Sequence, residues 1–213
     1  MTASTTDYPL TTTLNRIYSH TCLRHNSKEF WQRTLKALGK TQADDDLITF
    51  LEIADKAESC GLQFFSFDLL LCLKSAPEYS NHWRRFAVWC ARRQIQPTDA
   101  RSLQILNVAE RYAEGTASLA NLATAWEIAE NVYDELVDGC TRAEQSRVEA
   151  VWATTRPAAW KAAAMAFKAA ASAEAAQEGA VVLTTAWTSA HAAAQRRLIA
   201  AFRQLATDGT LPS

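Results

Sequence analysis

The sequence predicts an all-α protein, a helical bundle that carries a C-terminal Ala-rich helical hairpin. Only six of the 213 residues are Gly and five are Pro, and β-branched residues never alternate with polar ones over the length of a strand. The usual signals for strands and β-hairpins are therefore missing. Apolar residues recur instead at intervals of three and four, which is the spacing of one helix face. A hydrophobic content of 48% with 21% charged residues is typical of a globular chain with a buried core.

Four segments are expected along the chain. Residues 1–13 are polar and rich in hydroxyl groups, and we expect them to be flexible. Residues 14–156 form the helical bundle, residues 157–207 form the Ala-rich hairpin packed on it, and residues 208–213 are a tail. Caps and helix breakers divide the chain into roughly eight or nine helices.

Near the N-terminus, a helix with a capping Ser and a terminal Gly is expected. Ser27 is suited to cap a helix in which Trp31 and Leu35 lie on one face, and Gly39 is suited to end it. The acidic run 44–46 is expected at the N-terminus of the next helix, where negative charge is stabilising.

Four amphipathic helices are expected between residues 81 and 157. The first buries a stripe formed by Trp83, Phe86, Ala87 and Cys90. The third, over 118–137, separates its faces most clearly, with apolar residues as far as Leu136 on one side and carboxylates on the other. Thr141 and Glu144 have the spacing of a capping box, which starts the fourth helix.

From Pro157 to about Ala206 the sequence is dominated by Ala, with Gly179 near the middle. Ala has the highest helix propensity and lets helices approach closely, so two long helices in a hairpin are expected. On the second of them one stripe holds Trp187, His191, Leu198, Phe202 and Leu205. Either the bundle covers this stripe completely, or the stripe offers a surface for a partner or for self-association.

The composition predicts a cytoplasmic protein without a membrane partner. The five Cys are scattered with no C-x-x-C spacing, so no disulfide framework is expected and all five thiols are expected to be reduced. The sequence shows neither a secretory signal nor an apolar stretch of roughly 18 residues.

No catalytic, cofactor-binding or metal-binding pattern is identified. His20, Cys22 and His25 approach the spacing of metal ligands, but they lack a fourth ligand of their own type. None of Glu110, Glu114, Glu127 and Glu130 is followed by His at the third position, as di-metal sites in helical bundles require. Gly39-Lys40-Thr41 lacks the first Gly of a phosphate-binding loop. We therefore expect a protein that is not an enzyme, although scattered His and Cys residues that meet in space would escape such a search.

Three sets of residues are candidates for a partner surface. The first set is basic and consists of Arg84, Arg85, Arg92 and Arg93. The second set is acidic and consists of Glu127, Glu130, Asp134 and Asp138, which could present a row of negative charges to a basic protein. The third set is the aromatic pair Trp187 and Phe202.

Nucleic acid is an alternative partner that the charge balance disfavours. A basic groove would form if these arginines and the basic residues between Arg16 and Lys40 lay on adjacent faces. The formal net charge of −1 argues against such a groove. A protein partner is therefore expected.

A run of short motifs from His82 to Ser118 resembles a known group of proteins. The motifs are F-A-x-x-C-A-R over Phe86 to Arg92, D-x-R-S over Asp99 to Ser102, and A-E-R-Y-A-x-G over Ala109 to Gly115. They are similar to those of uncharacterised Ala-rich helical proteins of bacteria and their phages, some of them described as immunity proteins. This resemblance covers about half of the chain and brings no catalytic residues with it. It implies a setting of conflict, of phage against host or of toxin against immunity protein.

These observations predict a non-enzymatic protein that acts by occupying the surface of another protein. The resemblance implies an inhibitor of a defence system, as anti-CRISPR proteins are, or a protein that neutralises a toxin. Two alternatives stay open: a structural or virion-associated helical protein, and an enzyme whose site is not recognisable from the sequence.

Overall fold

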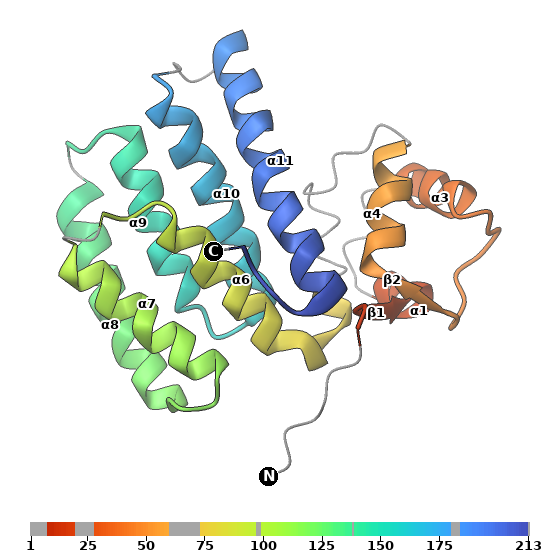
Figure 1. Ribbon diagram of the computed structural model, residues 1–213, viewed down its shortest axis with the longest axis horizontal. Helices are drawn as coiled ribbons and strands as arrows, with labels where there is room; N and C mark the ends of the chain where they lie inside the picture. Colours follow the sequence, from red (N-terminus) through yellow and green to blue (C-terminus); the bar gives the residue numbers. More distant parts are fainter. Residues whose placement is uncertain are drawn as a thin grey trace. The chain divides into compact units, whose positions relative to one another are not determined.

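The computed structural model describes residues 8–19, 28–59, 73–96, 99–137, 139–179 and 184–212. The chain divides into two compact units. Unit 1 comprises Met1–Glu78 and Phe202–Ser213, and unit 2 comprises Tyr79–Ala201. Helices dominate both units (Figure 1), so the predicted all-α class is confirmed.

Unit 1 contains a small antiparallel strand pair in addition to helices. Strand β1, Thr11–Thr13, pairs with strand β2, Leu47–Thr49, so that Thr12 lies opposite Ile48. The helices of this unit are α1 (Leu14–Tyr18), α3 (Lys28–Ala37) and α4 (Phe50–Ser59). The sequence did not predict the strands, because three residues are too few to show an alternating pattern.

The two ends of the described chain meet in unit 1. The amide of Leu10 donates a hydrogen bond to Ala206 O at 2.8 Å, and Leu10 O accepts one from the amide of Phe50 at 3.1 Å. The buried side chains of the unit include Leu10, Leu14, Phe50, Phe202 and Leu205. The last turns of α11, the helix Thr185–Asp208, therefore belong to the core of unit 1.

The expected capping role of the acidic run 44–46 is wrong. Strand β2 lies between this run and α4, which begins only at Phe50. Asp44 and Asp46 instead accept hydrogen bonds from Lys40 Nζ, at 2.5 and 2.9 Å. The cap of α4 comes from Thr49 and Glu52, since Glu52 Oε2 accepts from the Thr49 amide at 3.0 Å and Thr49 Oγ1 accepts from the Glu52 amide.

Unit 2 is built from six helices in the described part of the chain. They are α6 (Ser80–Arg92), α7 (Ala100–Ala113), α8 (Leu119–Val137), α9 (Arg142–Thr154), α10 (Ala159–Gln177) and α11 as far as Ala201. A 3-10 turn, Pro77–Tyr79, precedes α6. Asp99 caps α7, and Gly115 follows that helix with a positive φ of 75°, a conformation that Gly adopts without strain.

The core of unit 2 follows the predicted stripes closely. Trp83, Phe86, Ala87 and Cys90 of α6 are all buried. Two other residues of α6, Val88 and Ala91, pack in a buried cluster with residues of α7, α8, α9 and α10: Ile105, Leu106, Ala109, Leu122, Ala125, Ala129, Ala150, Val151 and Ala169. Leu136 is an exception, because 40% of its surface is exposed although its position on α8 predicted burial.

Helix α10 is the most enclosed helix of unit 2. Eleven of its residues are buried, and ten of these are Ala. The helix packs mainly against α9 and α6. Small side chains on most of its surface let both neighbours approach closely. The expected Ala-rich hairpin is therefore packed on the bundle through α10.

Helices α10 and α11 are joined by ion pairs as well as by their connection. Arg197 of α11 lies 2.9 Å from Glu174 Oε2 and 3.5 Å from Glu178 Oε1, both at the end of α10. Figure 1 shows α10 between α9 and α11. The boundary between the two units falls after Glu78 and again inside α11, after Ala201.

None of the helices in the described ranges combines the length and the apolar character that crossing a membrane requires. Of the five Cys, Cys90 and Cys140 lie in the described part, and both are free thiols. Burial raises the pKa of the Cys90 thiol well above its ordinary value, and the nearby carboxylate of Glu174 adds to the shift.

The predicted capping box at the start of α9 is confirmed. Thr141 Oγ1 accepts from the Glu144 amide at 3.3 Å, and Glu144 Oε2 accepts from the Thr141 amide at 2.8 Å. We expect Thr141→Ala to lower the free energy of unfolding by about 1 kcal/mol, the usual effect of losing such a cap. Urea unfolding followed by circular dichroism measures this loss. Thr124→Ala, at an exposed position inside α8, is the control and should change stability little.

Candidate functional site

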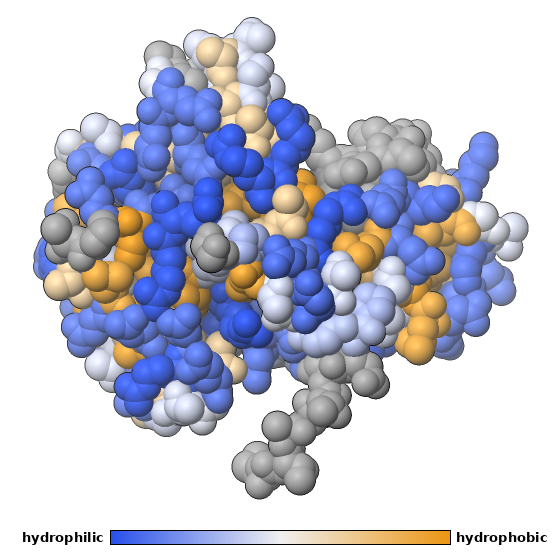
Figure 2. All heavy atoms as spheres, in the orientation of Figure 1, coloured by the Kyte–Doolittle hydropathy of each residue, from blue (hydrophilic) through white to orange (hydrophobic). Residues whose placement is uncertain are grey.

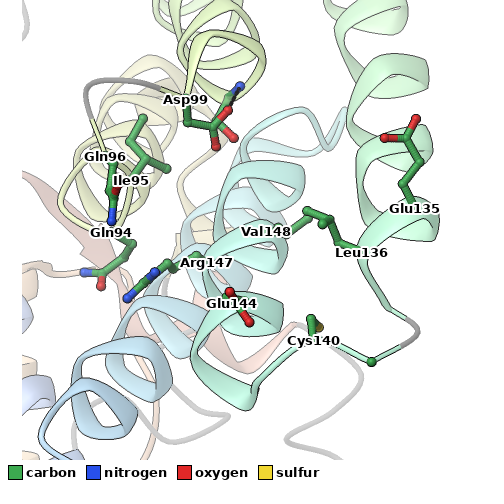
Figure 3. A pocket seen from close by; sticks show the side chains of 12 residues that line it. Gln94, Ile95, Gln96, Asp99, Glu135, Leu136, Cys140, Glu144, Arg147 and Val148 are labelled. Carbon is green, nitrogen blue, oxygen red and sulfur yellow. Dashed lines mark hydrogen bonds between the residues drawn. The ribbon is translucent and has the colours of Figure 1, made fainter.

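Unit 2 contains a cavity of about 580 Å³ where the ends of four helices meet. Its walls come from the C-terminal ends of α6 and α8 and from the N-terminal ends of α7 and α9 (Figure 3). The residues that line it are Gln94, Ile95, Gln96, Asp99, Ser102, Glu135, Leu136, Gly139, Cys140, Glu144, Arg147 and Val148. Its volume suits a small ligand or one or two side chains of a partner protein.

The local sequence explains why helices end and begin at the cavity. Helix α6 ends at Arg92, and the amide of Gln94 closes its last turn on Ala91 O at 2.9 Å. Asp99 then begins α7 by accepting a hydrogen bond from the Ser102 amide at 3.0 Å. On the opposite wall, Gly139 has a positive φ of 93° in the connection between α8 and the capping box of α9.

Part of the cavity wall is apolar. Ile95 and Val148 are half-buried, and Leu136 is exposed. Leu136 and Val148 point toward one another in Figure 3, and Figure 2 shows apolar side chains reaching the surface of unit 2 beside α9. An apolar residue that is not covered by its own unit is available for contact with a ligand.

The three carboxylates of the lining each have a partner. Asp99 Oδ1 accepts from the Ser102 amide, and Glu135 Oε2 lies 2.7 Å from Arg101 Nη1. Glu144 Oε2 accepts from the amide and the hydroxyl of Thr141. These two hydrogen bonds, together with the charge of Arg147, lower the pKa of Glu144 from its ordinary value.

Gln94 places an unsatisfied acceptor in the cavity wall. The residue is only 4% exposed, and its Nε2 donates to Glu174 Oε1 at 3.2 Å. This bond fixes the orientation of the carboxamide, because the reversed amide would set its oxygen against a carboxylate. Oε1 consequently faces away from Glu174, and it is a buried atom without a partner among the described residues.

Arg147 places an unsatisfied donor in the same wall. Its Nε is buried and has no hydrogen-bond partner within the described ranges. No described carboxylate lies within ion-pair distance of its guanidinium, although Glu144 occupies the preceding turn of α9. In Figure 3 the Arg147 side chain extends toward Gln94.

The two unsatisfied groups cost folding free energy. A buried donor or acceptor without a partner destabilises a protein by about 1 to 3 kcal/mol. Neither atom is accessible from the cavity, because each has almost no accessible surface. What the cavity offers a ligand is its aliphatic lining and the polar side chains beside it.

The structure removes Arg84 from the predicted basic surface. Its side chain is only 2% exposed, and its guanidinium donates to the carbonyl oxygens of Thr154, Arg156 and Pro157, at 2.5, 2.8 and 3.0 Å. It also lies over the ring of Tyr112, 5.0 Å from the centroid. Burial lowers the pKa of Arg84 to about 10, so the group is still charged at neutral pH. Arg84 joins α6 to the end of α9, and its role is structural.

The other three arginines of that set do not form one basic face. Arg92 lies 2.6 Å from Glu110 Oε2, and Arg93 lies 3.6 Å from Glu174 Oε1 and over the ring of Trp89. Arg85 is exposed. Intramolecular pairs thus engage Arg92 and Arg93, which weakens the case for a groove that binds nucleic acid.

The acidic and aromatic candidates are placed differently from one another. Glu127 and Asp134 are exposed and Glu130 is half-buried on α8, while Asp138 lies outside the described residues. Trp187 is half-buried and stacks on His191, with ring centroids 5.9 Å apart. Phe202 is fully buried, so it is a core residue and cannot anchor a partner in this structure.

No group of three or more His, Cys, Asp or Glu side chains that could hold a metal ion occurs within the described ranges. His20, Cys22 and His25 lie outside those ranges.

Two histidines of unit 2 should make its stability depend on pH. Burial lowers the pKa of His191, and burial together with the charge of Arg85 lowers that of His82. The folded state thus binds protons less readily than the unfolded state, and stability should fall as the pH drops below about 6.5. Guanidinium unfolding at about pH 7.5 and about pH 5.5 measures this loss. We expect it to be smaller in a variant with His82→Gln and His191→Gln; an unchanged loss would contradict the assignment.

The cavity residues carried almost no signal in the sequence. Gln94 follows the last turn of α6, and Arg147 lies on α9 one turn after Glu144, a spacing that usually forms an ion pair. Asp99, Ser102 and Glu144 belong to motifs found in the sequence and Leu136 ended a predicted buried stripe, but none of these signals indicated a cavity. Whether a polar side chain has a partner depends on neighbours that are distant in the sequence, and the pattern of one helix does not contain them.

Comparison with known proteins gave no match to a family model, to a curated protein or to a solved structure.

Proposed function

We propose that this chain is a non-enzymatic binding protein and that the cavity lined by Gln94, Arg147, Ile95, Leu136 and Val148 receives part of its partner. The observation that carries the proposal is a cavity of about 580 Å³ whose lining includes aliphatic side chains, one of which, Leu136, is 40% exposed. Apolar surface that a protein leaves uncovered in a concave site is available to a ligand or partner.

A protein partner is the form of this proposal that the surroundings of the cavity favour. Leu136 is exposed at the cavity, and two exposed carboxylates, Glu135 and Glu144, line the cavity with it. An apolar centre with charged residues around it is the usual arrangement of a protein interface. The resemblance to proteins of bacteria and phages suggests that the partner is a defence protein or a toxin, and that both meet in the cytoplasm.

Capture with a blocked cavity tests the proposal. Wild-type protein, Val148→Trp and Gln104→Trp are immobilised, and bacterial or phage-infected lysate is passed over each. The indole of Val148→Trp fills the cavity, whereas Gln104 is exposed on α7 and does not line it. We expect one species that wild type and Gln104→Trp retain and that Val148→Trp loses by about tenfold, equivalent to about 1.4 kcal/mol.

Identical capture by all three proteins would contradict the proposal. The same samples also address the alternatives. A homopolymer in light scattering that survives Val148→Trp favours the structural or virion-associated function. A small-molecule product that accumulates in lysate containing the folded protein, and not in lysate without it, favours an enzyme.

A further inference from the structure

The cavity of unit 2 is lined by a guanidinium whose outer end is accessible. Arg147 lines the cavity and is half-buried. Its terminal nitrogens, Nη1 and Nη2, form no hydrogen bond or ion pair with a residue in the described ranges, and only its Nε is a buried atom without a partner. The two terminal nitrogens therefore keep accessible surface, and their fork of N–H groups matches the two oxygens of a carboxylate.

Carboxylates that line the same cavity each use only one of their two oxygens within the described part of the chain. Glu144 accepts both hydrogen bonds from Thr141 on Oε2. Asp99 and Glu135 likewise make their described contacts through a single oxygen. All three carboxylates are exposed. Because an ionised carboxylate can accept on both oxygens, each of them can still receive a hydrogen bond from a cationic group of a ligand.

Glu144 and Arg147 border the cavity with opposite charges that do not touch one another. They lie three residues apart on α9, a spacing that places side chains on the same helix face. Glu144 is held in the capping box with Thr141, and its carboxylate forms no ion pair with Arg147. In Figure 3 the charged ends of the two side chains lie apart. The hydrogen bonds from Thr141 lower the pKa of Glu144, and the charge of Arg147 adds to that shift, so the two groups are within electrostatic reach.

This arrangement favours a ligand that carries both charges. An anion bound at Arg147 would lie near the carboxylate of Glu144, and a cation bound at Glu144 would lie near the guanidinium of Arg147. A zwitterion places a charge of opposite sign at each of them. The aliphatic lining, formed by Ile95, Leu136 and Val148, offers contact to an apolar group attached to the same ligand.

We propose that the cavity binds a free α-amino acid with an aliphatic side chain. The carboxylate of the ligand accepts from the terminal nitrogens of Arg147, and its ammonium group donates to the carboxylate of Glu144. Its side chain contacts the aliphatic lining. An α-amino acid carries both charged groups on one carbon atom, which suits two side chains one helical turn apart. The inference goes beyond the proposed function, because it assigns a small-molecule ligand to the cavity.

A titration with matched probes tests this chemistry. Leucine is compared with isopentylamine, which lacks only its carboxylate, and with isocaproate, which lacks only its ammonium group. Each probe is added to full-length ¹⁵N-labelled protein, and amide shifts of Ile95, Cys140 and Val148 report binding. We expect leucine to bind at least about tenfold more tightly than either analogue. An analogue that binds as tightly as leucine, or the absence of shifts at these residues with leucine, would overturn the inference.

Arg147→Met tests the contact with the ligand carboxylate. The variant loses the guanidinium and keeps an aliphatic stem. We expect it to bind leucine at least about tenfold more weakly than wild type, and isopentylamine no more weakly, because isopentylamine has no carboxylate. Arg142→Met is the matched control: Arg142 is exposed on the same helix and is not part of the lining, and its loss changes the net charge equally. Equal effects of the two substitutions on leucine would refute the role of Arg147.

Glu144→Gln tests the contact with the ligand ammonium group. Gln keeps an oxygen that can accept from Thr141, so the capping box is retained while the charge is lost. We expect this variant to bind leucine and isopentylamine more weakly and isocaproate no more weakly. Glu127→Gln, at an exposed position of α8 outside the lining, should bind all three probes as wild type does. Circular dichroism checks that each variant is folded. Leucine binding that is unchanged by Glu144→Gln would contradict the assignment.

The two proposals fail separately. If leucine binds as expected but Val148→Trp captures the same lysate species as wild type, the proposed function fails and the amino-acid site stands. If Val148→Trp loses a captured species but wild type binds leucine no more tightly than its analogues, the cavity receives a partner and only the inferred ligand is wrong.

Discussion

Arg84→Met is expected to lower the free energy of unfolding by about 3 to 4 kcal/mol. Arg84 donates hydrogen bonds to the carbonyl oxygens of Thr154, Arg156 and Pro157, where α9 ends. Met fills the space of the aliphatic stem but offers no donor, so three carbonyl groups lose their partner in the interior. The contact of the guanidinium with the ring of Tyr112 is lost as well. Guanidinium unfolding followed by tryptophan fluorescence measures the change.

Two further variants separate the geometry of Arg84 from its charge. Arg84→Lys keeps a positive charge but replaces the planar fork by one ammonium group, which cannot reach all three carbonyls at once. We expect it to recover about half of the stability that Arg84→Met loses. Arg196→Ala, at an exposed position on α11, should change stability by less than about 0.5 kcal/mol. Equal effects of Arg84→Met and Arg196→Ala would show that the buried hydrogen bonds contribute little.

Arg84 illustrates a limit of sequence analysis that is physical in origin. Four arginines within ten residues indicate a basic face, because charged side chains are almost never fully buried unless they are paired. The partners of Arg84 are backbone carbonyls some seventy residues away, at a helix end that leaves its last acceptors free. Neither the end of α9 nor its position beside α6 can be derived from the sequence around Arg84.

The capping box at Thr141, by contrast, was predicted correctly. It involves residues three positions apart, so its geometry follows from the helix itself. The buried stripe of α6 was predicted in full for the same reason. The candidate site could not be predicted in this way. Its walls combine the ends of four helices that are distant in the sequence, and the sequence does not show which of its polar atoms lack a hydrogen-bond partner.

The Ala-rich segment shows how one composition supports two architectures. Many Ala residues allow close helix packing, but they do not determine on how many sides of the helix neighbours pack. Burial of eleven residues around α10 shows that neighbours enclose most of it. The hairpin was predicted to pack on the bundle, but only the positions of α6 and α9 show how much of α10 they enclose.

The predicted stripe of α11 ends in a residue whose removal should be costly. Phe202 is fully buried, as are Leu198 and Leu205 on the same helix. We expect Phe202→Ala to lower the free energy of unfolding by about 3 to 5 kcal/mol, since the substitution removes a buried ring and leaves a cavity. Phe202→Leu, which refills most of that space, should cost about 1 kcal/mol.

Trp187→Ala on the same stripe is expected to behave differently. Trp187 is half-buried and its described ring contact is with His191, so its loss should cost about 1 kcal/mol. Thermal unfolding of the two variants measures the contrast directly. If Trp187→Ala unfolded as early as Phe202→Ala, the N-terminal part of α11 would belong to the core despite its exposure. If Trp187→Ala kept its melting temperature and lost the species captured from lysate, Trp187 would anchor the partner, and the binding surface would extend beyond the cavity at Gln94 and Arg147.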